Sequence, residues 1–427
     1  MTVASRSLRE IRPIGPLHAK VRPPGSKSLT NRALLVAALA EGDSLVTNAL
    51  VSDDTRYMAG ALRVLGLVID EGDDGTRIAI AGCGGAFPVA RADLYVGDAG
   101  TAMRFLTAAL AVGRGRYTVD GDERMRRRPI GDLVDGLRQL GVDISARDGR
   151  YPPVTIAATG LSGGTCAIDG STSSQFISAL LMAAPYARGD VTVRVTGDLV
   201  SAPYVTMTRR VMADFGVEID EPEPRVWRVP AGRRYRGTTY AVEPDASAAS
   251  YWFAAAAVTG GTVRVDGIGS GSVQGDMAFV DLLARMGCAV RRGAAWTEVS
   301  GGQLRGIDAD MRDISDTAMT LAVVALFADS PTRIGGIANV RVKESDRIAA
   351  MTTEARKLGA EVEELPDGMI IRPRPLHGAV IETYNDHRLA MSFAVVGLRQ
   401  PGVVIADPGC VAKTYPRFFD ELARVGA

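Results

Sequence analysis

The chain has 427 residues, of which 46% are hydrophobic and 23% are charged, a composition that excludes a disordered or fibrous protein. Lys plus Arg and Asp plus Glu both number 49, so no global field attracts nucleic acid or an anionic membrane surface. The longest apolar stretches, 251–258 and 321–328, are far shorter than the roughly 20 residues of a membrane span, and the N-terminus lacks the apolar segment of a secretory signal. We therefore expect a cytoplasmic protein with domains of about 200 residues each.

Two kinds of predicted helix alternate along the chain. The first kind is Ala-rich, apolar nearly all round and followed by a β-branched strand, and it occurs within 33–47, 103–119, 177–193, 250–265, 319–334 and 389–405. The second kind is amphipathic, ends in an apolar residue plus Gly, and occurs within 61–70, 136–145, 210–220, 282–290, 354–363 and 421–427. A helix that is apolar on all sides is buried, whereas an amphipathic helix covers the outside of a domain.

The second kind of helix recurs at a nearly constant interval, because its final glycines are Gly66, Gly141, Gly216, Gly287, Gly359 and Gly426. This spacing predicts six α/β repeats, three to a domain. The sixth repeat stops at Ala427 without its last strands. We therefore expect the segment from Ser7 to Val21 to fold back onto the second domain. The predicted domains are residues 22–240 and residues 241–427 plus 1–21, with two adjacent crossings that allow a hinge.

Nearly all the unusual polar motifs stand just before, or in the first turn of, one of these helices. They are Pro24–Ser28, Gly97–Thr101, Glu123–Arg128, Ser171–Gln175, Ser201–Tyr204, Asp316, Lys343–Arg347, Asn385–Arg388 and Lys413–Thr414. The N–H groups at a helix start suit phosphate or carboxylate, although Ser and Thr there also serve as helix N-caps.

Helix starts alone cannot hold an anionic ligand. Each contributes about 0.3–1 kcal/mol, whereas micromolar binding needs about 8 kcal/mol. Charge-assisted hydrogen bonds of about 1.5–3 kcal/mol each have to supply the rest. The candidate cations are Lys27, Arg32, Arg104, Arg124, Arg347, Arg388 and Lys413.

Other motif-based functions are excluded or weak. A P-loop requires Gly directly before its Lys, and Ser26 stands before Lys27. The glycines of 267–271 do not complete a dinucleotide fingerprint, because Gln274 occupies the third glycine position. The four cysteines and three histidines are widely spaced, which predicts neither a zinc site nor a disulfide framework. We expect no metal and no cofactor.

Taken together, the motifs identify a family resemblance that runs almost end to end. They are PPGSKSLTNRALLVAALA, GDAGTAMRF, RMRRRPIGDL, SSQFISALLMAAP, SAPYVTMT, SDTAMT, NVRVKESDR, NDHRLAM and DPGCVAKTYP. The sequence resembles the 5-enolpyruvylshikimate-3-phosphate (EPSP) synthase family of enolpyruvyl transferases. The resemblance implies two domains of three β-α-β-α-β-β units with buried helices, closing on an active site in the interdomain cleft. It also implies transfer of the enolpyruvyl group of phosphoenolpyruvate to the 5-hydroxyl of shikimate 3-phosphate, with release of phosphate.

The resemblance assigns roles to residues at matching positions. Asp316 is the base for the 5-hydroxyl, Glu344 and Lys413 handle the methyl proton, and Lys27 and His387 complete the catalytic set. The residues implied to bind phosphoenolpyruvate are Lys27, Gly100, Thr101, Arg124, Gln175, Arg347, Arg388 and Lys413. Those implied to bind shikimate 3-phosphate are Lys27, Ser28, Arg32, Ser173, Ser174, Gln175, Ser201, Tyr204, Asp316, Asn339 and Lys343. The first domain is implied to be the shikimate 3-phosphate side and the second the phosphoenolpyruvate side.

The sequence departs from the family pattern at two positions of one motif. Asp98 stands where the family commonly has Asn, and Phe105 stands where it has Pro. An ionised Asp98 would weaken binding of an anion unless an arginine such as Arg124 or Arg347 pairs with it. Arg126, Arg127 and Arg128 form a basic run, of which the first two are more simply interpreted as part of a solvated loop.

Two alternatives stay open. The related UDP-N-acetylglucosamine enolpyruvyl transferases use a cysteine on the loop that corresponds to 121–129, and this loop has none. A non-catalytic anion-binding protein on the same scaffold would gain nothing from acidic groups beside its ligand, so Asp316 and Glu344 argue against it. We expect a monomer whose partners are the two substrates, and neither nucleic acid nor a membrane.

Overall fold

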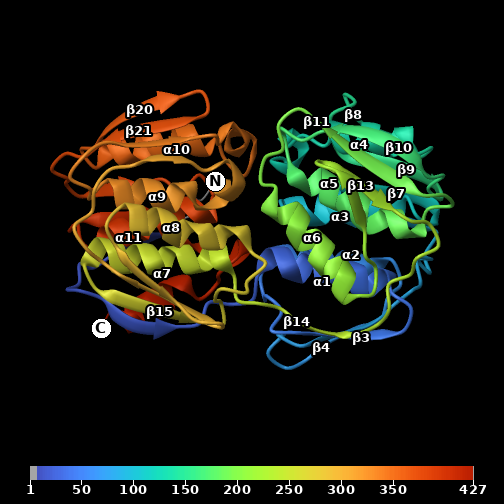
Figure 1. Ribbon diagram of the computed structural model, residues 1–427, viewed down its shortest axis with the longest axis horizontal. Helices are drawn as coiled ribbons and strands as arrows, with labels where there is room; N and C mark the ends of the chain where they lie inside the picture. The colour runs from blue at the N-terminus through green and yellow to red at the C-terminus, as the bar shows by residue number, and fades with distance from the viewer. Residues whose placement is uncertain (1–6, 427) are drawn as a thin grey trace, which may run out of the picture. The chain divides into compact units, whose positions relative to one another are not determined.

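A computed structural model describes residues 7–426, which form two compact units (Figure 1). Of the described residues, the N-terminal unit comprises 25–243 and the C-terminal unit comprises 244–426 together with 7–24. The chain crosses at Pro24–Gly25 and at Glu243–Pro244. Gly25 is required at the first crossing, since a Cβ there would lie 1.9 Å from the carbonyl oxygen of Asn48. Within the described residues, no helix has the length and apolar character needed to span a membrane.

The N-terminal unit is built from short strands and helices of about three turns. Its strands are β3 (Asp43–Thr47), β4 (Ile69–Glu71), β5 (Ile78–Ala81), β6 (Arg91–Tyr95), β7 (Arg114–Asp120), β8 (Asp143–Arg147), β9 (Tyr151–Thr159), β10 (Gly164–Asp169), β11 (Val191–Thr196), β12 (Asp220–Glu223), β13 (Val226–Val229) and β14 (Thr239–Ala241). Its helices are α1 (Lys27–Leu39), α2 (Asp53–Val64), α3 (Gly100–Leu110), η1 (Met125–Arg127), α4 (Gly131–Gln139), α5 (Ser174–Ala183), η2 (Ala184–Tyr186) and α6 (Pro203–Asp214).

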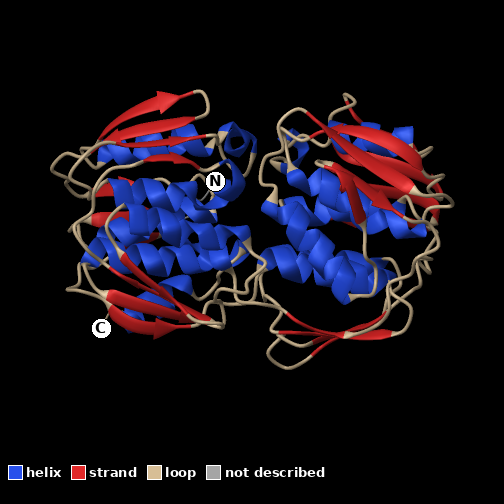
Figure 2. Ribbon diagram, viewed as in Figure 1, coloured by secondary structure: helices blue, strands red, loops and turns tan. Residues whose placement is uncertain are grey.

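These strands form three four-stranded sheets, in the orders β14-β3-β5-β4, β6-β7-β9-β8 and β10-β11-β13-β12. In each sheet the first two strands are parallel and the others are antiparallel. The sheets lie at the outside of the unit and the helices inside (Figure 2). Helices α1, α3 and α5 are buried almost all round, whereas α2, α4 and α6 bury one face. The two predicted kinds of helix are therefore confirmed, and β6-α3-β7-α4-β8-β9 is one complete repeat.

The C-terminal unit repeats this plan. Its strands are β1 (Leu8–Glu10), β2 (His18–Val21), β15 (Thr262–Asp266), β16 (Ala289–Arg292), β17 (Trp296–Ser300), β18 (Asp308–Asp310), β19 (Thr332–Gly335), β20 (Glu361–Leu365), β21 (Gly368–Arg372), β22 (Ala379–Ile381) and β23 (Val403–Ala406). Its helices are α7 (Ala246–Thr259), η3 (Gly275–Ala278), α8 (Phe279–Arg285), η4 (Arg312–Thr317), α9 (Ala318–Ala325), η5 (Ala338–Val342), α10 (Arg347–Lys357), α11 (His387–Gly397), η6 (Pro408–Lys413) and α12 (Phe418–Val425). Its sheets have the orders β16-β17-β15-β2, β18-β19-β21-β20 and β1-β23-β22.

The first strands of the first and fourth repeats are exchanged. Strand β2, which precedes α1 in the chain, pairs in parallel with β15 of the fourth repeat. Strand β14, which precedes α7, pairs in parallel with β3 of the first repeat. The N-terminal segment also supplies β1, which lies antiparallel to β23 of the incomplete sixth repeat. Each unit thus depends on a strand that the linear order of repeats would give to the other.

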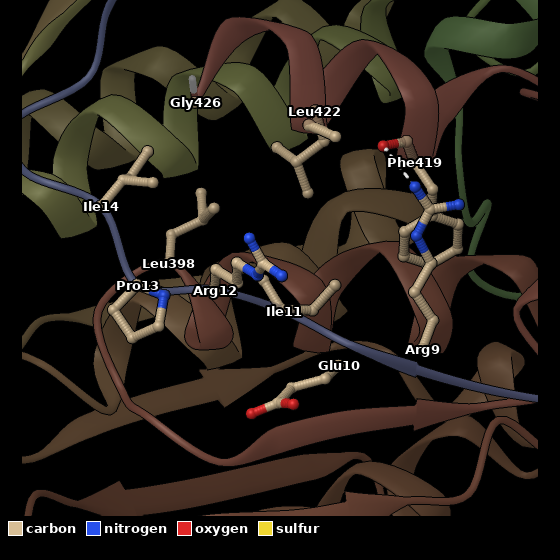
Figure 3. Close-up of a pocket in the computed structure, with 11 residues that line it drawn as sticks. Arg9, Glu10, Ile11, Arg12, Pro13, Ile14, Leu398, Phe419, Leu422 and Gly426 are labelled. Carbon is tan, nitrogen blue, oxygen red and sulfur yellow. Dashed lines mark hydrogen bonds between the residues drawn. The ribbon is translucent and has the colours of Figure 1, made fainter.

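A pocket of about 440 Å³ marks the place where this N-terminal segment packs on α12 (Figure 3). Its apolar lining includes Ile11, Leu398 and Leu422. The guanidinium of Arg9 lies 5.0 Å from the centre of the Phe419 ring and donates to the carbonyl oxygen of that residue at 3.1 Å. The pocket contains none of the candidate site residues, and its contacts serve to hold the segment on the unit.

Candidate active site

In the N-terminal unit, the start of α1 carries an ion pair between a half-buried lysine and a buried aspartate. Ser26 caps the helix by accepting a hydrogen bond from the backbone N–H of Leu29. The ammonium of Lys27 lies 3.3 Å from a carboxylate oxygen of Asp54, which stands in the first turn of α2 and is 2% exposed. The sequence indicated Lys27 but not Asp54, because an acid in the first turn of a helix is ordinary.

Arg32, one turn further along α1, links three helix starts. Its guanidinium donates to the carbonyl oxygens of Ser28 at 3.0 Å and Tyr204 at 3.2 Å, and to the hydroxyls of Thr208 at 2.8 Å and Ser178 at 3.3 Å. These contacts bring the predicted residues of α1 and α6 together with α5. Burial lowers the pKa of Arg32 to about 10.

Phe105, which stands where the family commonly has Pro, contacts the same arginine, Arg32. The Phe105 ring is fully buried, and the guanidinium carbon of Arg32 lies 5.1 Å from its centre. Such a cation–π contact contributes about 0.5–2 kcal/mol and offsets part of the cost of burying the charge. Phe105 therefore packs behind α1 rather than obstructing the start of α3.

The starts of α3 and α5 are joined by a side-chain contact. The amide of Gln175 donates to the hydroxyl of Thr101 at 3.4 Å. Ser173 is the N-cap of α5 and accepts from the backbone N–H of Gln175 at 3.2 Å, so the N-cap interpretation holds for this residue. Helix α3 starts at Gly100 with no side-chain cap. Ser174 and Ser201 are buried, and Ser201 has a left-handed backbone with φ of 54° just before α6.

The basic loop ahead of α4 separates into surface and buried arginines. Arg126 pairs with Asp120 at 2.5 Å and Arg127 pairs with Glu123, both at the surface, as expected of a solvated loop. Arg124 is half-buried, whereas Arg128 is buried and donates to the carbonyl oxygen of Asp98 at 3.1 Å.

Arg128 therefore contacts the backbone of the Asp98 motif, a position for which the sequence did not suggest it. A Cβ on Gly100 would lie 2.6 Å from a terminal nitrogen of Arg128. Arg104 fastens the same region by donating to the carbonyl oxygens of Gly100 at 3.1 Å and Pro129 at 2.8 Å. It thus orders the loop and the helix start.

In the C-terminal unit, the predicted residues gather around Arg347. Its side chain is fully buried at the start of α10 and contacts three carboxylates, those of Asp316 at 3.2 Å, Glu344 at 2.8 Å and Asp386 at 2.8 Å. Asp386 is the N-cap of α11 and also accepts from the backbone N–H of Arg388. Although burial lowers it, the three carboxylates raise the pKa of Arg347 above its usual value.

Asp316 is shared by three cations. One carboxylate oxygen contacts Lys343 at 2.7 Å and Arg347 at 3.2 Å, and the other contacts Arg388 at 2.8 Å. Burial alone would raise its pKa, but Arg388, Lys343 and Arg347 hold the pKa of Asp316 well below its usual range. Burial in turn lowers the pKa of Lys343, and Asp316 opposes this effect. The carboxylate is ionised, and the three cations are turned toward one point.

The other predicted residues of this unit lie on the neighbouring segments. Asn339 is buried on η5 and donates to the hydroxyl of Ser315 at 3.2 Å. His387 and Lys413 are buried at the start of α11 and the end of η6. Nδ1 of His387 lies 3.8 Å from a carboxylate oxygen of Asp386. Among the described residues, no three His, Cys, Asp or Glu side chains are grouped as metal ligands.

The structure adds residues that the sequence did not single out, namely Asp54, Arg128 and Asp386. Each belonged to a recognised motif or helix start but had an ordinary explanation as a cap or a surface charge. Their burial could not be read from the motifs. For Arg128, a signal of burial was available in the sequence, because Pro129 and the apolar Ile130 follow it directly.

Comparison with known proteins agrees with this fold and these motifs. The family described as EPSP synthase (3-phosphoshikimate 1-carboxyvinyltransferase) matches residues 11–422. The chain is 51% identical to the 3-phosphoshikimate 1-carboxyvinyltransferase of Trichormus variabilis, over 95% of each chain. It is 48% identical to that of Photobacterium profundum, over 97% of this chain and 98% of the other. An EPSP synthase structure from Acinetobacter baumannii superposes with a TM-score of 0.83 at 27% identity, over 99% of this chain and 98% of the other. The chain belongs to the EPSP synthase family.

Proposed function

We propose that this chain transfers the enolpyruvyl group of phosphoenolpyruvate to the 5-hydroxyl of shikimate 3-phosphate and releases phosphate. The observation that carries the proposal is the position of Asp316, a carboxylate whose side chain is 17% exposed and which contacts Lys343, Arg347 and Arg388. A base for a substrate hydroxyl and cations for substrate anions stand here side by side. We propose that the residue groups of both units act on the same pair of substrates.

The chemistry follows from the assigned roles. Asp316 accepts the proton of the 5-hydroxyl as the oxygen of that hydroxyl bonds to C2 of phosphoenolpyruvate. At the same time, Glu344 with Lys413 gives a proton to C3. In the resulting tetrahedral intermediate, the bond between C2 and the phosphate oxygen breaks, and phosphate leaves with that oxygen. The methyl group then returns a proton to Glu344 or Lys413. His387, buried at the start of α11, belongs to the same set.

The binding residues serve one substrate or both, and some of them also have a catalytic role. We assign Lys27, Gly100, Thr101, Arg124, Arg128, Gln175, Arg347, Arg388 and Lys413 to phosphoenolpyruvate. We assign Lys27, Ser28, Arg32, Ser173, Ser174, Gln175, Ser201, Tyr204, Asp316, Asn339 and Lys343 to shikimate 3-phosphate. The buried side-chain oxygen of Asn339, which accepts no hydrogen bond from the described residues, suits a substrate hydroxyl.

The low pKa of Asp316 sets a condition on this mechanism. With three cations beside it, the carboxylate is a weak base in the unliganded protein. Substrate anions that share Lys343, Arg347 and Arg388 reduce the pull of these cations on Asp316. Basicity is therefore gained when the substrates bind, which confines proton removal to the loaded enzyme.

The test is release of inorganic phosphate from phosphoenolpyruvate and shikimate 3-phosphate in the presence of a metal chelator. We expect release that requires both compounds, with heat-inactivated protein as the control. Absence of release above that control would overturn the proposal. The alternative that acts on UDP-N-acetylglucosamine uses a loop cysteine, and the loop 121–129 has none. We further propose a cytoplasmic monomer, for which light scattering should give the mass of one chain.

Gly100→Ala is expected to raise the KM for phosphoenolpyruvate about 10-fold or more. The added Cβ would lie 2.6 Å from the guanidinium of Arg128 and displace it. Loss of one charge-assisted hydrogen bond corresponds to about 1.5–3 kcal/mol, and each 1.4 kcal/mol is about tenfold in affinity. Gly60→Ala is the matched control, because nothing lies within 4 Å of its Cβ. Equal KM values in the two variants would remove Arg128 from the site.

A further inference from the structure

A buried hydroxyl and a buried carboxyl group lie behind Arg388, outside the residues assigned above. Ser247 is in the first turn of α7 and Asp276 is on η3, and they are 8% and 4% exposed. The Ser247 hydroxyl donates a hydrogen bond to a carboxylate oxygen of Asp276. A terminal nitrogen of Arg388 lies 3.5 Å from the Ser247 oxygen and 2.8 Å from Asp316. The arginine is thus held between the proposed base and this pair.

The direction of the hydrogen bond between Ser247 and Asp276 decides what the hydroxyl can do for Arg388. A serine hydroxyl has one hydrogen and two acceptor lone pairs. Because that hydrogen points at Asp276, the oxygen presents only lone pairs to the guanidinium, which can only donate. Without an acceptor at Asp276, the hydroxyl could turn its hydrogen toward Arg388 and repel it.

A third side chain fixes the two segments on which this arrangement depends. Gln274, which is buried just before η3, accepts from the backbone N–H of Ala246 at 3.0 Å and donates to the carbonyl oxygen of Pro244 at 2.8 Å. These bonds tie η3 to the start of α7, so Asp276 and Ser247 face each other without depending on a ligand.

We infer that Ser247 and Asp276 are positioning residues that hold Arg388 for phosphoenolpyruvate when Asp316 turns to the substrate hydroxyl. The inference rests on the proposed function, in which Arg388 binds phosphoenolpyruvate. While Asp316 carries its charge, Asp316 and the Ser247 hydroxyl both hold Arg388. Once Asp316 takes up the proton, its attraction for Arg388 weakens, and Ser247 with Asp276 keeps the guanidinium in place.

The state of Asp276 suits this role at mildly alkaline pH. Burial, followed by the charge of Asp316, raises the pKa of Asp276 to about 6, while the bond from Ser247 and the charge of Arg388 oppose the rise. At pH 8 the carboxylate is ionised and accepts from Ser247. Assays at that pH therefore report on the intact arrangement.

The test compares steady-state kinetics of Ser247→Ala and Ser250→Ala at pH 8. Ser250 is the matched control, since it is a buried serine one turn further along α7. Its hydroxyl donates to the backbone carbonyl oxygen of Ser247 and lies beside the hydroxyl of Thr320. Ser247→Ala should raise the KM for phosphoenolpyruvate about 3- to 10-fold, the worth of one hydrogen bond, and leave the KM for shikimate 3-phosphate unchanged. Ser250→Ala should leave both KM values unchanged.

Two more variants separate positioning from a general loss of structure. Ser247→Thr keeps the hydroxyl, so its KM for phosphoenolpyruvate should be close to that of the wild type. Asp276→Leu, which removes the acceptor for the Ser247 hydroxyl, should raise that KM, and the double variant with Ser247→Ala should raise it no further, because both changes act through one contact. This inference would be overturned if Ser247→Ala had the KM values of the wild type, or if its KM rose equally for both substrates. The proposed function would still stand in that case, provided that the wild type is active. An inactive wild type would overturn both.

Discussion

Asp316→Asn is expected to lower turnover about 10²- to 10⁴-fold, the usual worth of a general base, while phosphoenolpyruvate still binds. The amide has the shape of the carboxylate but cannot accept the hydroxyl proton. Lys343, Arg347 and Arg388 keep their charges and lose the carboxylate that they share, so anion binding is retained or strengthened. Phosphate release measures turnover, and isothermal titration measures binding.

Asp313→Asn is the control for this experiment. Asp313 stands on the same 3-10 helix, η4, but its side chain is exposed. We expect it to behave like the wild type in both measurements. If Asp316→Asn kept the turnover of Asp313→Asn, Asp316 would not be the base. If Asp316→Asn lost phosphoenolpyruvate binding as well as turnover, the substitution would have disrupted the whole site rather than removed only the base.

Arg347→Met is expected to give the largest loss of stability, about 3–5 kcal/mol in the free energy of unfolding. The side chain is fully buried, and its removal leaves the carboxylates of Asp316, Glu344 and Asp386 without their common partner. Leaving a buried charge without its partner costs much free energy, whereas an intact buried ion pair stabilises the protein little more than apolar residues in its place would. Urea denaturation, with the midpoint and slope compared between variants, measures the loss.

The pH dependence of this loss follows from the depressed pKa of Asp316. A carboxylate with a depressed pKa stabilises the native state above its unfolded pKa of about 3.9, and this contribution disappears as pH falls through the folded pKa. In Arg347→Met, Asp316 loses one of its three cations and takes up a proton at a higher pH than in the wild type. The stability difference should therefore be largest near neutral pH and shrink in acid. Arg374→Met, which breaks an exposed pair with Glu361, should stay close to the wild type throughout.

The repeats and the general plan of the site were predictable because they depend on local pattern. A recurring glycine after each amphipathic helix indicated six repeats, and the all-apolar helices are those that the structure buries. Polar motifs before Arg347 and Arg388 stand at helix starts, where the structure brings both side chains to Asp316. Such features need only the period of a helix and the chemistry of its first turn.

The remainder could not be predicted because it depends on contacts between distant segments. The sequence assigned the segment that forms β2 to the second domain, but it did not indicate that β2 pairs with β15 or β14 with β3, because no local pattern distinguishes equivalent parallel partners. Asp386 and Asp54 look like ordinary acids at helix starts until a cation is found beside each of them. Arg128 and Arg127 are neighbours of the same type, and only packing buries the first and exposes the second.

The central claim is that the enolpyruvyl group moves as a unit, by addition to C2 and elimination of phosphate. The most direct measurement uses phosphoenolpyruvate labelled with ¹⁸O at the oxygen between C2 and phosphorus, incubated with shikimate 3-phosphate and the protein. Because the bond between C2 and that oxygen breaks, the released phosphate should carry the label, and mass spectrometry should find an enolpyruvyl ether without it. Unlabelled phosphate, or a labelled product, would mean that the bond to phosphorus breaks instead and would contradict the account.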